Sequence, residues 1–549
     1  MDRSPPVRRP ITALLAATAA VYCLGTAWSF GAGAGADPGA KPATADSYDT
    51  YMAEKGALAD DAAPSTVAVG TAGELPDLGS PAEAAISLED EYSVGLTIIR
   101  GMRARHEILE DPEVSEYIQS IGHRLSSFAE EGQHEFYYFV AKDPTVNAFA
   151  LPGGFIGINS GLFLLTRNEN ELAGILAHET AHVTQRHIAR SLVEHSHAGL
   201  VSTAAMLAAI LLGATAGHGS PDAMEGAVLA TQSAAIQHQI NYTRSQEYEA
   251  DRIGIYTMAS AGFDPLGMAS AFENLERNGP DPSRTQAISF LIDHPVTSDR
   301  IAEARNRAAQ IGRIRHQDSI SYGLMRERLR SLIGDSHAAV TYYADLRKNG
   351  GGRDLDDRYG MDVALTNAKN PAPAIKDLQA LLHQYPRVTQ LYGALGQAYL
   401  ANGQLQDSQA ILEKALTLFP RNVPISIRLA QTYMQAGENE RAHLLLLDLF
   451  DVVEPTPDQA RLIAKAANAA GDVADSYYYM SEFYIMNGDL ARSSNELQLA
   501  LALPGLNPIQ RARFSARLEE VRAAMSKNKI KNTADDNGGG AGSGGAGQH

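Results

Sequence analysis

The spacing of apolar residues predicts helices first and strands next in the first regularly patterned part of the chain. In residues 112–121, PEVSEYIQSI, apolar residues recur every three or four positions, which is typical of an amphipathic helix. Runs of aromatic and branched residues follow at Phe136–Val140, Ala148–Leu151 and Phe155–Ile158, and Pro152-Gly153-Gly154 separates the last two. Such runs around a Pro-Gly-Gly break predict strands joined by a turn.

A longer helix is predicted from Leu172 to about Val193. Asn168 lies three residues before Glu171, a spacing that fits a capping box at the start of this helix. Further on, Gly199–Gly217 carries no charge and is about as long as a membrane span. Its many Ala, Gly, Ser and Thr residues make it only weakly apolar, so we favour a buried or surface-docking helix and leave peripheral membrane contact open.

From about Ser321 to Asn528 the pattern is almost entirely helical and repeats with a period of 34 residues. The clearest unit returns one period later: Leu395-Gly396, Tyr399, Ser408, Leu412, Ala415 and Pro420 recur as Leu429-Ala430, Tyr433, Ala442, Leu446, Leu449 and, one residue late, Pro455. This spacing resembles the tetratricopeptide repeat, whose paired helices need small residues where they cross. We therefore expect an α-solenoid with a concave binding face over residues 316–530; an irregular helical bundle is the alternative.

The two ends of the chain have compositions that do not favour a folded core. Basic residues, an apolar run from Ile11 to about Trp28 and a small-residue stretch give residues 1–36 the order of a secretory signal peptide, and an uncleaved anchor is the alternative. Tyr22 before Cys23 disfavours a lipid attachment site. Residues 37–85 and 531–549 are rich in small and polar residues, so we expect a flexible linker and a disordered tail.

Length and charge narrow the class of protein. The 549 residues are enough for three or four domains. Lys plus Arg number 46 and Asp plus Glu number 64, so the net charge of −18 argues against nucleic-acid binding. Cys23 is the single cysteine, so an internal disulfide is impossible. An exported chain without disulfides suits the oxidising bacterial periplasm, and an extracellular setting would look the same.

The candidate chemistry lies on the helix predicted after Leu172. His178, Glu179 and His182 form the pattern H-E-x-x-H. Two histidines four residues apart differ by about 40° around an α-helix, so both imidazoles can face one metal ion. The pattern indicates zinc, with Glu179 placed to hold a water molecule and take its proton.

A catalytic zinc usually has three protein ligands, so a third donor is needed. A metzincin is excluded because Gln185 and Ile188 stand where that class has Gly and His. The third donor is expected in a second helical segment, where Glu247 is favoured over Glu249, which points roughly the other way and is expected to be a solvated charge. Asp251 lies one turn after Glu247 and could orient a ligand histidine.

Together these motifs resemble the zinc peptidase family that includes the CAAX prenyl protease and the bacterial heat-shock membrane protease. The resemblance covers about Ile86 to Ile311 and includes Asn159-Ser160-Gly161-Leu162 besides the two helical motifs. It implies a mainly α protein: a gluzincin-type α+β metalloprotease domain with a small sheet over 86–315, followed by the array. It also implies one Zn2+ per chain on His178, His182 and Glu247, and Glu179 as the general base. With one doubtful apolar run, the chain fits the soluble periplasmic branch.

Asp293-His294-Pro295 precedes a further predicted helix that contains Arg300. In the resembled branch this region lies near the zinc. His294 is therefore expected to stabilise the tetrahedral intermediate or to occupy the water's site and hold the enzyme latent, and a cap of the following helix is the alternative. Arg300 is a candidate to support the site from outside the ligands. His187, His195 and His197 lack ligand spacing and are expected at the surface.

The expected activity is peptide-bond hydrolysis by a zinc metalloendopeptidase in outer-membrane protein quality control. Extended substrates would add a strand to an edge near Phe149–Leu151 or Phe155–Ile158. The resemblance implies unfolded or stalled envelope proteins as substrates and outer-membrane assembly machinery as a partner of the array. A zinc-containing chaperone or adaptor is the alternative, although structural zinc sites usually use Cys and His. A membrane-embedded prenyl-type protease is the third hypothesis.

Overall fold

The computed structural model describes residues 86–129, 135–196, 243–278 and 290–538. The predicted signal peptide, the linker and the run 199–217 lie outside the described residues. The chain divides into one compact unit of residues 76–447 and 455–549 and a second of residues 1–75 and 448–454. The helices and strands below belong to the first unit, except for the end of α21.

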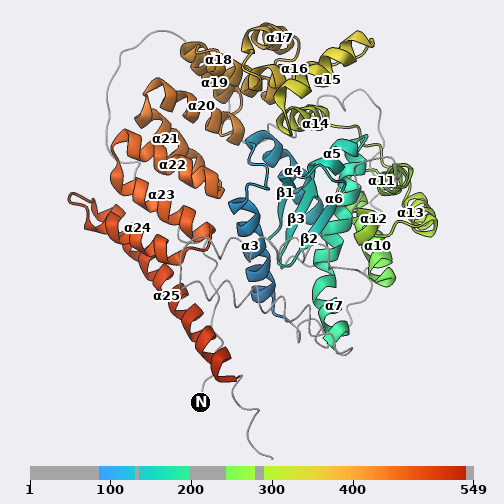
Figure 1. The fold of residues 1–549 in the computed structure, drawn as a ribbon, viewed down its shortest axis with the longest axis horizontal. Helices are drawn as coiled ribbons and strands as arrows, with labels where there is room; N and C mark the ends of the chain where they lie inside the picture. The colour runs from blue at the N-terminus through green and yellow to red at the C-terminus, as the bar shows by residue number, and fades with distance from the viewer. Residues whose placement is uncertain (1–85, 130–134, 197–242, 279–289, 539–549) are drawn as a thin grey trace, which may run out of the picture. The chain divides into compact units, whose positions relative to one another are not determined.

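A three-stranded sheet forms the centre of the part of the chain before the helical array (Figure 1). Its strands are β1 (Tyr137–Ala141), β2 (Ala148–Leu151) and β3 (Phe155–Asn159). The order is β1-β3-β2, with β3 parallel to β1 and antiparallel to β2. The predicted small sheet is confirmed, but the prediction of an open edge at Phe155–Ile158 is wrong, because β3 pairs on both sides.

The turn between β2 and β3 depends on two glycines. Gly153 and Gly154 have φ of +79° and +93°, a region that residues with a side chain rarely adopt. A Cβ on Gly153 would lie 2.3 Å from the Tyr92 Cα atom, so the turn also packs directly on α3 (Leu88–Ala104). The positive φ values and this close approach together explain why glycines follow Pro152 in this turn.

Residues of the strands alternate between two apolar cores. One face carries Tyr138, Val140, Ala148, Ala150, Ile156 and Ile158. These side chains pack in the same core as α4 (Pro112–Ser126) and α6 (Glu169–Thr184). The other face, with Phe139, Phe149, Leu151 and Phe155, packs with α3 (Leu88–Ala104). The sheet is therefore buried on both sides, which fixes the helix that carries the metal motif.

Helix α6 is capped by Asn168 as predicted, but it begins at Glu169, three residues before the predicted Leu172, and it ends earlier. The Asn168 side chain accepts from the Glu171 N–H, but the reciprocal half of a capping box is missing, because the Glu171 carboxylate accepts from the Arg167 N–H instead. The prediction of one helix to Val193 is wrong: α6 stops at Thr184, and α7 (His187–Ser196) begins after Arg186, whose φ is +49°.

Among the described residues, five further helices complete this part of the chain. They are α5 (Ser160–Leu165), α10 (Arg244–Ser260), α11 (Leu266–Arg277), α12 (Phe290–Asp293) and α13 (Ser298–Ile311). Helices α10 and α11 both pack against α6, and α13 packs against both of them. This arrangement brings α6, α10 and the segment before α13 to one place.

Residues 320–538 form consecutive antiparallel helices, as the repeat pattern predicts (Figure 1). They are α14 (Ile320–Leu332), α15 (Ser336–Lys348), α16 (Leu355–Asn367), α17 (Pro371–Gln384), α18 (Thr389–Ala401), α19 (Leu405–Leu418), α20 (Val423–Ala436), α21 (Asn439–Phe450), α22 (Pro457–Ala470), α23 (Val473–Met486), α24 (Leu490–Ala502) and α25 (Pro508–Gly538). The repeat pattern also predicts small residues where paired helices cross. Helices α18 and α19 cross at Gly396, where a Cβ would lie 2.7 Å from the Leu412 side chain, so only a small residue fits there. Helix α25 extends to Gly538 and so includes the first residues of the tail that we expected to be disordered.

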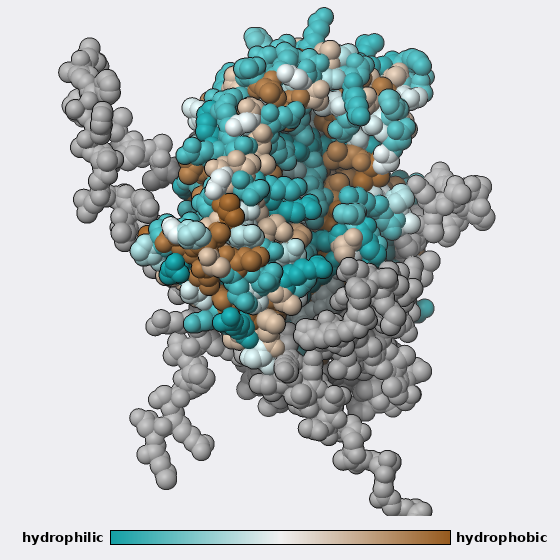
Figure 2. All heavy atoms as spheres, turned by 60° about the vertical axis from the view of Figure 1, so that its left-hand side comes forward, coloured by the Kyte–Doolittle hydropathy of each residue, from teal (hydrophilic) through white to brown (hydrophobic). Residues whose placement is uncertain are grey.

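The surface turned forward in Figure 2 is mostly hydrophilic, and its hydrophobic residues gather in separate patches. Within the described ranges, every helix is too short or too polar to cross a membrane.

Candidate metal centre

Helix α6 directs the two motif histidines toward one point. His178 and His182 are fully buried, and their Nε2 atoms lie 3.1 Å apart. Helix α6 packs between the sheet and α10, so neither ring is free to turn toward solvent. The i, i+4 spacing therefore has the geometric result expected of it.

Helix α10 supplies the carboxylate that faces these histidines. Glu247 is buried, with Oε1 3.4 Å from His182 Nε2 and Oε2 3.5 Å from His178 Nε2. Thr243 caps the helix and Gln246 completes a capping box, so the first turn that carries Glu247 is well defined. Glu247, and not Glu249, joins the histidines.

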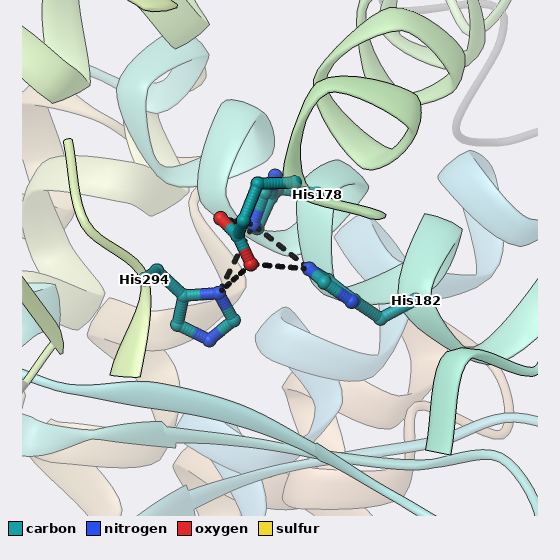
Figure 3. A group of neighbouring side chains, drawn as sticks. His178, His182 and His294 are labelled. Atoms are coloured by element: carbon teal, nitrogen blue, oxygen red, sulfur yellow. Dashed lines mark hydrogen bonds and ion pairs between the residues drawn. The ribbon is translucent and has the colours of Figure 1, made fainter. Parts of the chain in front are cut away.

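His294 completes the group from the segment between α12 and α13. Its Nδ1 lies 2.9 Å from Glu247 Oε1 and 3.3 Å from His178 Nε2. Figure 3 shows the rings of His178, His182 and His294 pointing toward one another. The alternative of a helix cap is wrong, because Thr297 caps α13.

The spacing of these four side chains fits a metal ion. Their ligand atoms all lie within 4.8 Å of one another. Atoms about 2.0–2.1 Å from a tetrahedral zinc are about 3.3 Å apart, and the separations above scatter around that value. Two imidazole nitrogens 3.1 Å apart need either a shared proton or a cation between them. The donor set of three histidines and one glutamate suits a divalent transition metal.

Asp251 and Arg300 support the group from behind. His178 Nδ1 lies 3.0 Å from Asp251 Oδ1, so a carboxylate faces the ring nitrogen that points away from the other donors. Arg300 donates to both Asp251 oxygens at 2.7 Å and lies 2.6 Å from Glu247 Oε2 through Nη1. One buried arginine therefore holds both carboxylates of α10 in position.

Glu179 is the unsatisfied carboxylate of the site. It is fully buried, and among the described residues neither of its oxygens has a hydrogen-bond partner. Burial raises the pKa of Glu179. His294 Nε2 is 3.6 Å from Glu179 Oε1. Burying a carboxylate without hydrogen bonds costs folding free energy, and such groups are characteristic of functional sites.

The protonation of the donors depends on their neighbours. Burial lowers the pKa of His178, but hydrogen bonds with Asp251 and Glu247 outweigh burial and raise it to about 9. Burial holds the pKa of His182 well below its ordinary value. Burial alone would raise the pKa of Glu247, yet His294, His178 and His182 hold it well below its ordinary range. The group is thus an ionised carboxylate among imidazoles.

The expectation that His187 lies at the surface is wrong. His187 is fully buried, with Nδ1 2.9 Å from His182 Nδ1. Glu249, expected to be a solvated charge, is only partly exposed and lies 3.2 Å from His187 Nε2. The break at Arg186 redirects the chain and makes this contact possible, and the sequence has no simple signal for it. The side chain of His195 and all of His197 lie outside what the structure describes.

Asn147 is a further residue that sequence reasoning missed. Its Nδ2 donates to Asp293 Oδ2 at 3.2 Å, and the Phe290 N–H donates to the Val146 carbonyl at 3.0 Å. These bonds join the start of the edge strand β2 to the segment that carries His294. The contact spans 146 residues of sequence, so local patterns do not reveal it.

Comparisons with known proteins agree with this geometry. The model of peptidase family M48 matches residues 112–308, and a tetratricopeptide repeat model matches residues 400–466. The first range contains all the donors above, and the second lies within the helical array. The repeat array and the metallopeptidase are therefore confirmed.

Three curated relatives are similar over different shares of the chain. A Beta-barrel assembly-enhancing protease of Yersinia pestis is 31% identical over 82% of this chain and 91% of its own length. The protein of the same name in Escherichia coli (strain K12) is 30% identical over 84% of this chain and 93% of its own length. The mitochondrial metalloendopeptidase OMA1 of Schizosaccharomyces pombe is 30% identical over 34% of this chain and 50% of its own length. On these matches and on the histidines and glutamate that converge from α6 and α10, the chain belongs to peptidase family M48, in a form that carries tetratricopeptide repeats.

Proposed function

We propose that this metallopeptidase is a zinc-dependent endopeptidase of the bacterial envelope that cleaves misfolded or stalled proteins selected by its repeat array. The observation that carries the proposal is Glu179, a buried carboxylate that has no hydrogen-bond partner among the described residues and lies beside converging metal donors. A site of this composition is suited to activating water.

His178, His182 and Glu247 would hold the zinc, and Asp251 with Arg300 would keep His178 and Glu247 oriented. A bound zinc ion supplies Lewis acidity: it polarises a carbonyl and lowers the pKa of water. Glu179 takes the proton from the attacking water and later delivers it to the leaving amine. Burial raises the pKa of Glu179, which makes its carboxylate a better proton acceptor in the first of these two roles.

His294 has the place of a fourth donor in this arrangement. Its Nδ1 is as close to Glu247 and His178 as a tetrahedral ligand set requires. We propose that the enzyme is latent in this arrangement, because His294 occupies the position that the water molecule needs. The segment that carries it would then have to move before hydrolysis begins.

Strand β2 is the best candidate for the substrate-binding edge. It pairs only with β3 within the sheet and packs against α6, which carries Glu179. An extended peptide could add to this edge through backbone hydrogen bonds, with little sequence preference. The array would provide selection through protein–protein contacts, which is the usual use of such repeats.

The envelope setting rests on the signal-like order of residues 1–36 and on the names of the relatives, two of which are Beta-barrel assembly-enhancing proteases. We propose the periplasm as the location and outer-membrane proteins, together with the machinery that assembles them, as clients or partners. Fractionation of cells that express the full chain tests this location: cleaved chain should be released with periplasmic proteins.

A zinc-containing chaperone or adaptor is the alternative function. In that case the metal would only stabilise the fold, and Glu179 would have no task. The decisive experiment compares the wild type with Glu179→Gln on an unfolded substrate. We expect the variant to keep its zinc and to lose about 10²–10⁴-fold in cleavage rate, because the proton acceptor is removed.

The matched control is Glu276→Gln, which makes the same chemical change at an exposed position of α11. It should cleave like the wild type. Equal cleavage by Glu179→Gln and the wild type would falsify the peptidase mechanism and favour the chaperone.

A further inference from the structure

The two motif histidines are supported in different ways on the side that faces away from the other donors. We propose that His187 is a positioning residue for His182, and that Glu249 and Arg190 hold His187 in turn. The inference rests on the proposed zinc site and adds to it a second supporting chain of side chains.

This chain of contacts is continuous. His182 directs Nε2 toward Glu247 and His178, which leaves its Nδ1 facing His187 Nδ1 at 2.9 Å. His187 Nε2 lies 3.2 Å from Glu249 Oε2. The same carboxylate oxygen accepts from Arg190 Nη1 at 2.9 Å. An arginine-anchored carboxylate therefore reaches His182 through one intervening imidazole.

Only one arrangement of protons makes every contact favourable when His182 binds a metal. A ligand nitrogen must offer its lone pair, so His182 Nε2 carries no proton and Nδ1 does. That N–H must donate to His187 Nδ1, which therefore also lacks a proton. His187 then carries its proton on Nε2 and donates it to Glu249. The reverse direction would put a proton on His182 Nε2 and block the metal.

The fold is built to make this contact. In an uninterrupted helix, five residues turn the chain by about 500°, which would put His187 about 140° away from the face of His182. Helix α6 ends at Thr184, and the left-handed Arg186 turns the chain before α7 begins at His187. The Gln246 side chain also reaches the His187 carbonyl, at 3.5 Å. The break thus brings His187 back to the ring five residues before it.

His178 provides the comparison that gives the contact its meaning. Its Nδ1 faces Asp251 directly, and Arg300 holds Asp251. Helix α10 thus offers one ligand, Glu247, and two and four residues later the carboxylates Glu249 and Asp251, which support the two histidines. Both His178 and His182 are thus supported by a carboxylate that is paired with an arginine. His178 contacts its carboxylate directly, whereas His182 contacts its carboxylate through His187.

Partners of this kind fix the tautomer and orientation of a ligand histidine, and their removal typically costs 10–100-fold in metal affinity. The test measures zinc affinity of the full chain by competition with a chromophoric chelator, for the wild type, His187→Phe and His187→Asn. Phenylalanine keeps the ring volume without an acceptor. Asparagine places its Oδ1 near the former Nδ1 and keeps the acceptor for His182.

We expect His187→Phe to bind zinc 10–100-fold more weakly and His187→Asn to stay within about threefold of the wild type. The visible spectrum of the cobalt-loaded proteins gives a second readout. The bands should shift in His187→Phe and match the wild type in His187→Asn, because only the first frees the ligand ring to reorient. His123→Phe, at an exposed position of α4, is the matched control and should change neither.

Equal affinities and spectra in the wild type and His187→Phe would overturn the proposal, and so would equal losses in both variants, since packing alone would then explain the effect. If His187→Phe does not fold, Glu249→Ala against Glu249→Gln replaces the pair, because Gln keeps an acceptor at a partly exposed position. A wild type that binds neither zinc nor cobalt would overturn the zinc site itself, which separates the two failures.

Discussion

Two groups of buried charged side chains in this molecule look alike in composition and differ in how well they are satisfied. The metal centre combines Glu179 and Glu247 with three histidines. A second group, here called the arginine–carboxylate cluster, consists of Asp111, which caps α4, Glu113 in the first turn of α4, Arg328 from α14 and Arg428 from α20. All are largely or fully buried.

In the arginine–carboxylate cluster every charge has a partner. Arg328 donates to both Asp111 oxygens at 2.7 Å, and Arg428 donates to Glu113 Oε2 at 2.6 Å. Burial alone would raise the pKa of Asp111, but Arg328 and Arg428 hold it below its ordinary value. Two acids and two arginines give a neutral group, so the cluster can join α4 to the array without needing a ligand.

The metal centre lacks this balance. Glu179 has no hydrogen-bond partner in the described part of the chain, and three imidazoles converge on one carboxylate. A fully paired cluster stabilises one arrangement of helices, whereas an incomplete one leaves atoms available to a cation, a water molecule or a substrate. The difference teaches that completeness of hydrogen bonding, and not burial of charge, separates the functional group from the structural one.

The largest effect on activity and stability is expected when the metal centre loses the proposed ligand Glu247. Glu247→Gln should abolish cleavage and weaken zinc binding, because a neutral amide is a poor ligand for zinc. Thermal unfolding with and without a chelator measures this. The wild type should lose up to about 4 kcal/mol of stability when zinc at about 1,000 times its Kd is removed, and the variant much less. A variant that responds to the chelator like the wild type would contradict the role of Glu247.

The next largest effect, on the free energy of unfolding, is expected when the arginine–carboxylate cluster loses one arginine. Arg328→Met leaves Asp111 with one arginine in a buried place and should cost about 3–5 kcal/mol of the free energy of unfolding. Chemical denaturation gives the measurement. Zinc affinity should not change, because the cluster does not contact the donors. Arg441→Met is the control: this side chain is 51% exposed in its ion pair with Glu413 and should cost less than about 1 kcal/mol.

The smallest effect concerns a buried carboxylate outside the metal centre that has one unsatisfied oxygen. Asp362 in α16 is 1% exposed, and its Oδ2 has no hydrogen-bond partner among the described residues. Burial and the neighbouring Asp377 raise the pKa of Asp362 to about 9. Between the unfolded pKa of about 3.9 and this value, the folded state holds a proton that the unfolded chain has released. Stability should therefore fall as pH rises through this window.

Asp362→Asn removes this pH-dependent cost. We expect the variant to be more stable than the wild type by about 1–3 kcal/mol at pH 8 and by less at pH 5. Denaturation at the two pH values is the measurement. A gain of the same size at both would show that the effect is not titration, and a loss at pH 8 would show that the carboxylate has a partner. The result would show whether an unsatisfied buried carboxylate outside the metal centre, such as Asp362, only destabilises the fold, in contrast to Glu179.

The sequence predicted those features that depend on short spacing. The motif H-E-x-x-H specifies that His178 and His182 share a helix face, and the strands and repeats follow from local patterns. The structure also brings Glu247 to the histidines, as the family resemblance implied, together with Asp251, which lies one turn later on the same helix. Their roles as ligand and support stay predictions until a metal is measured.

Features that depend on distant pairing were beyond the sequence. The parallel pairing of β1 with β3 makes Phe155–Ile158 a central strand, and nothing in the run itself indicates its neighbours. His187 was misjudged because a regular helix was assumed through Arg186. Asp111 and Arg428 are 317 residues apart, so their contact becomes visible only in the fold.

The arginine–carboxylate cluster bears on how freely this architecture can be recombined. Both acids lie at the N-terminus of α4 and both arginines come from the helical array, so each half alone carries two like charges that have lost their partners. A foreign repeat domain grafted onto this peptidase would need arginines at the same two places, or a neutral residue in place of each acid. Peptidase and repeats are in this sense a matched set, and a chimera that keeps only one half should fold in low yield.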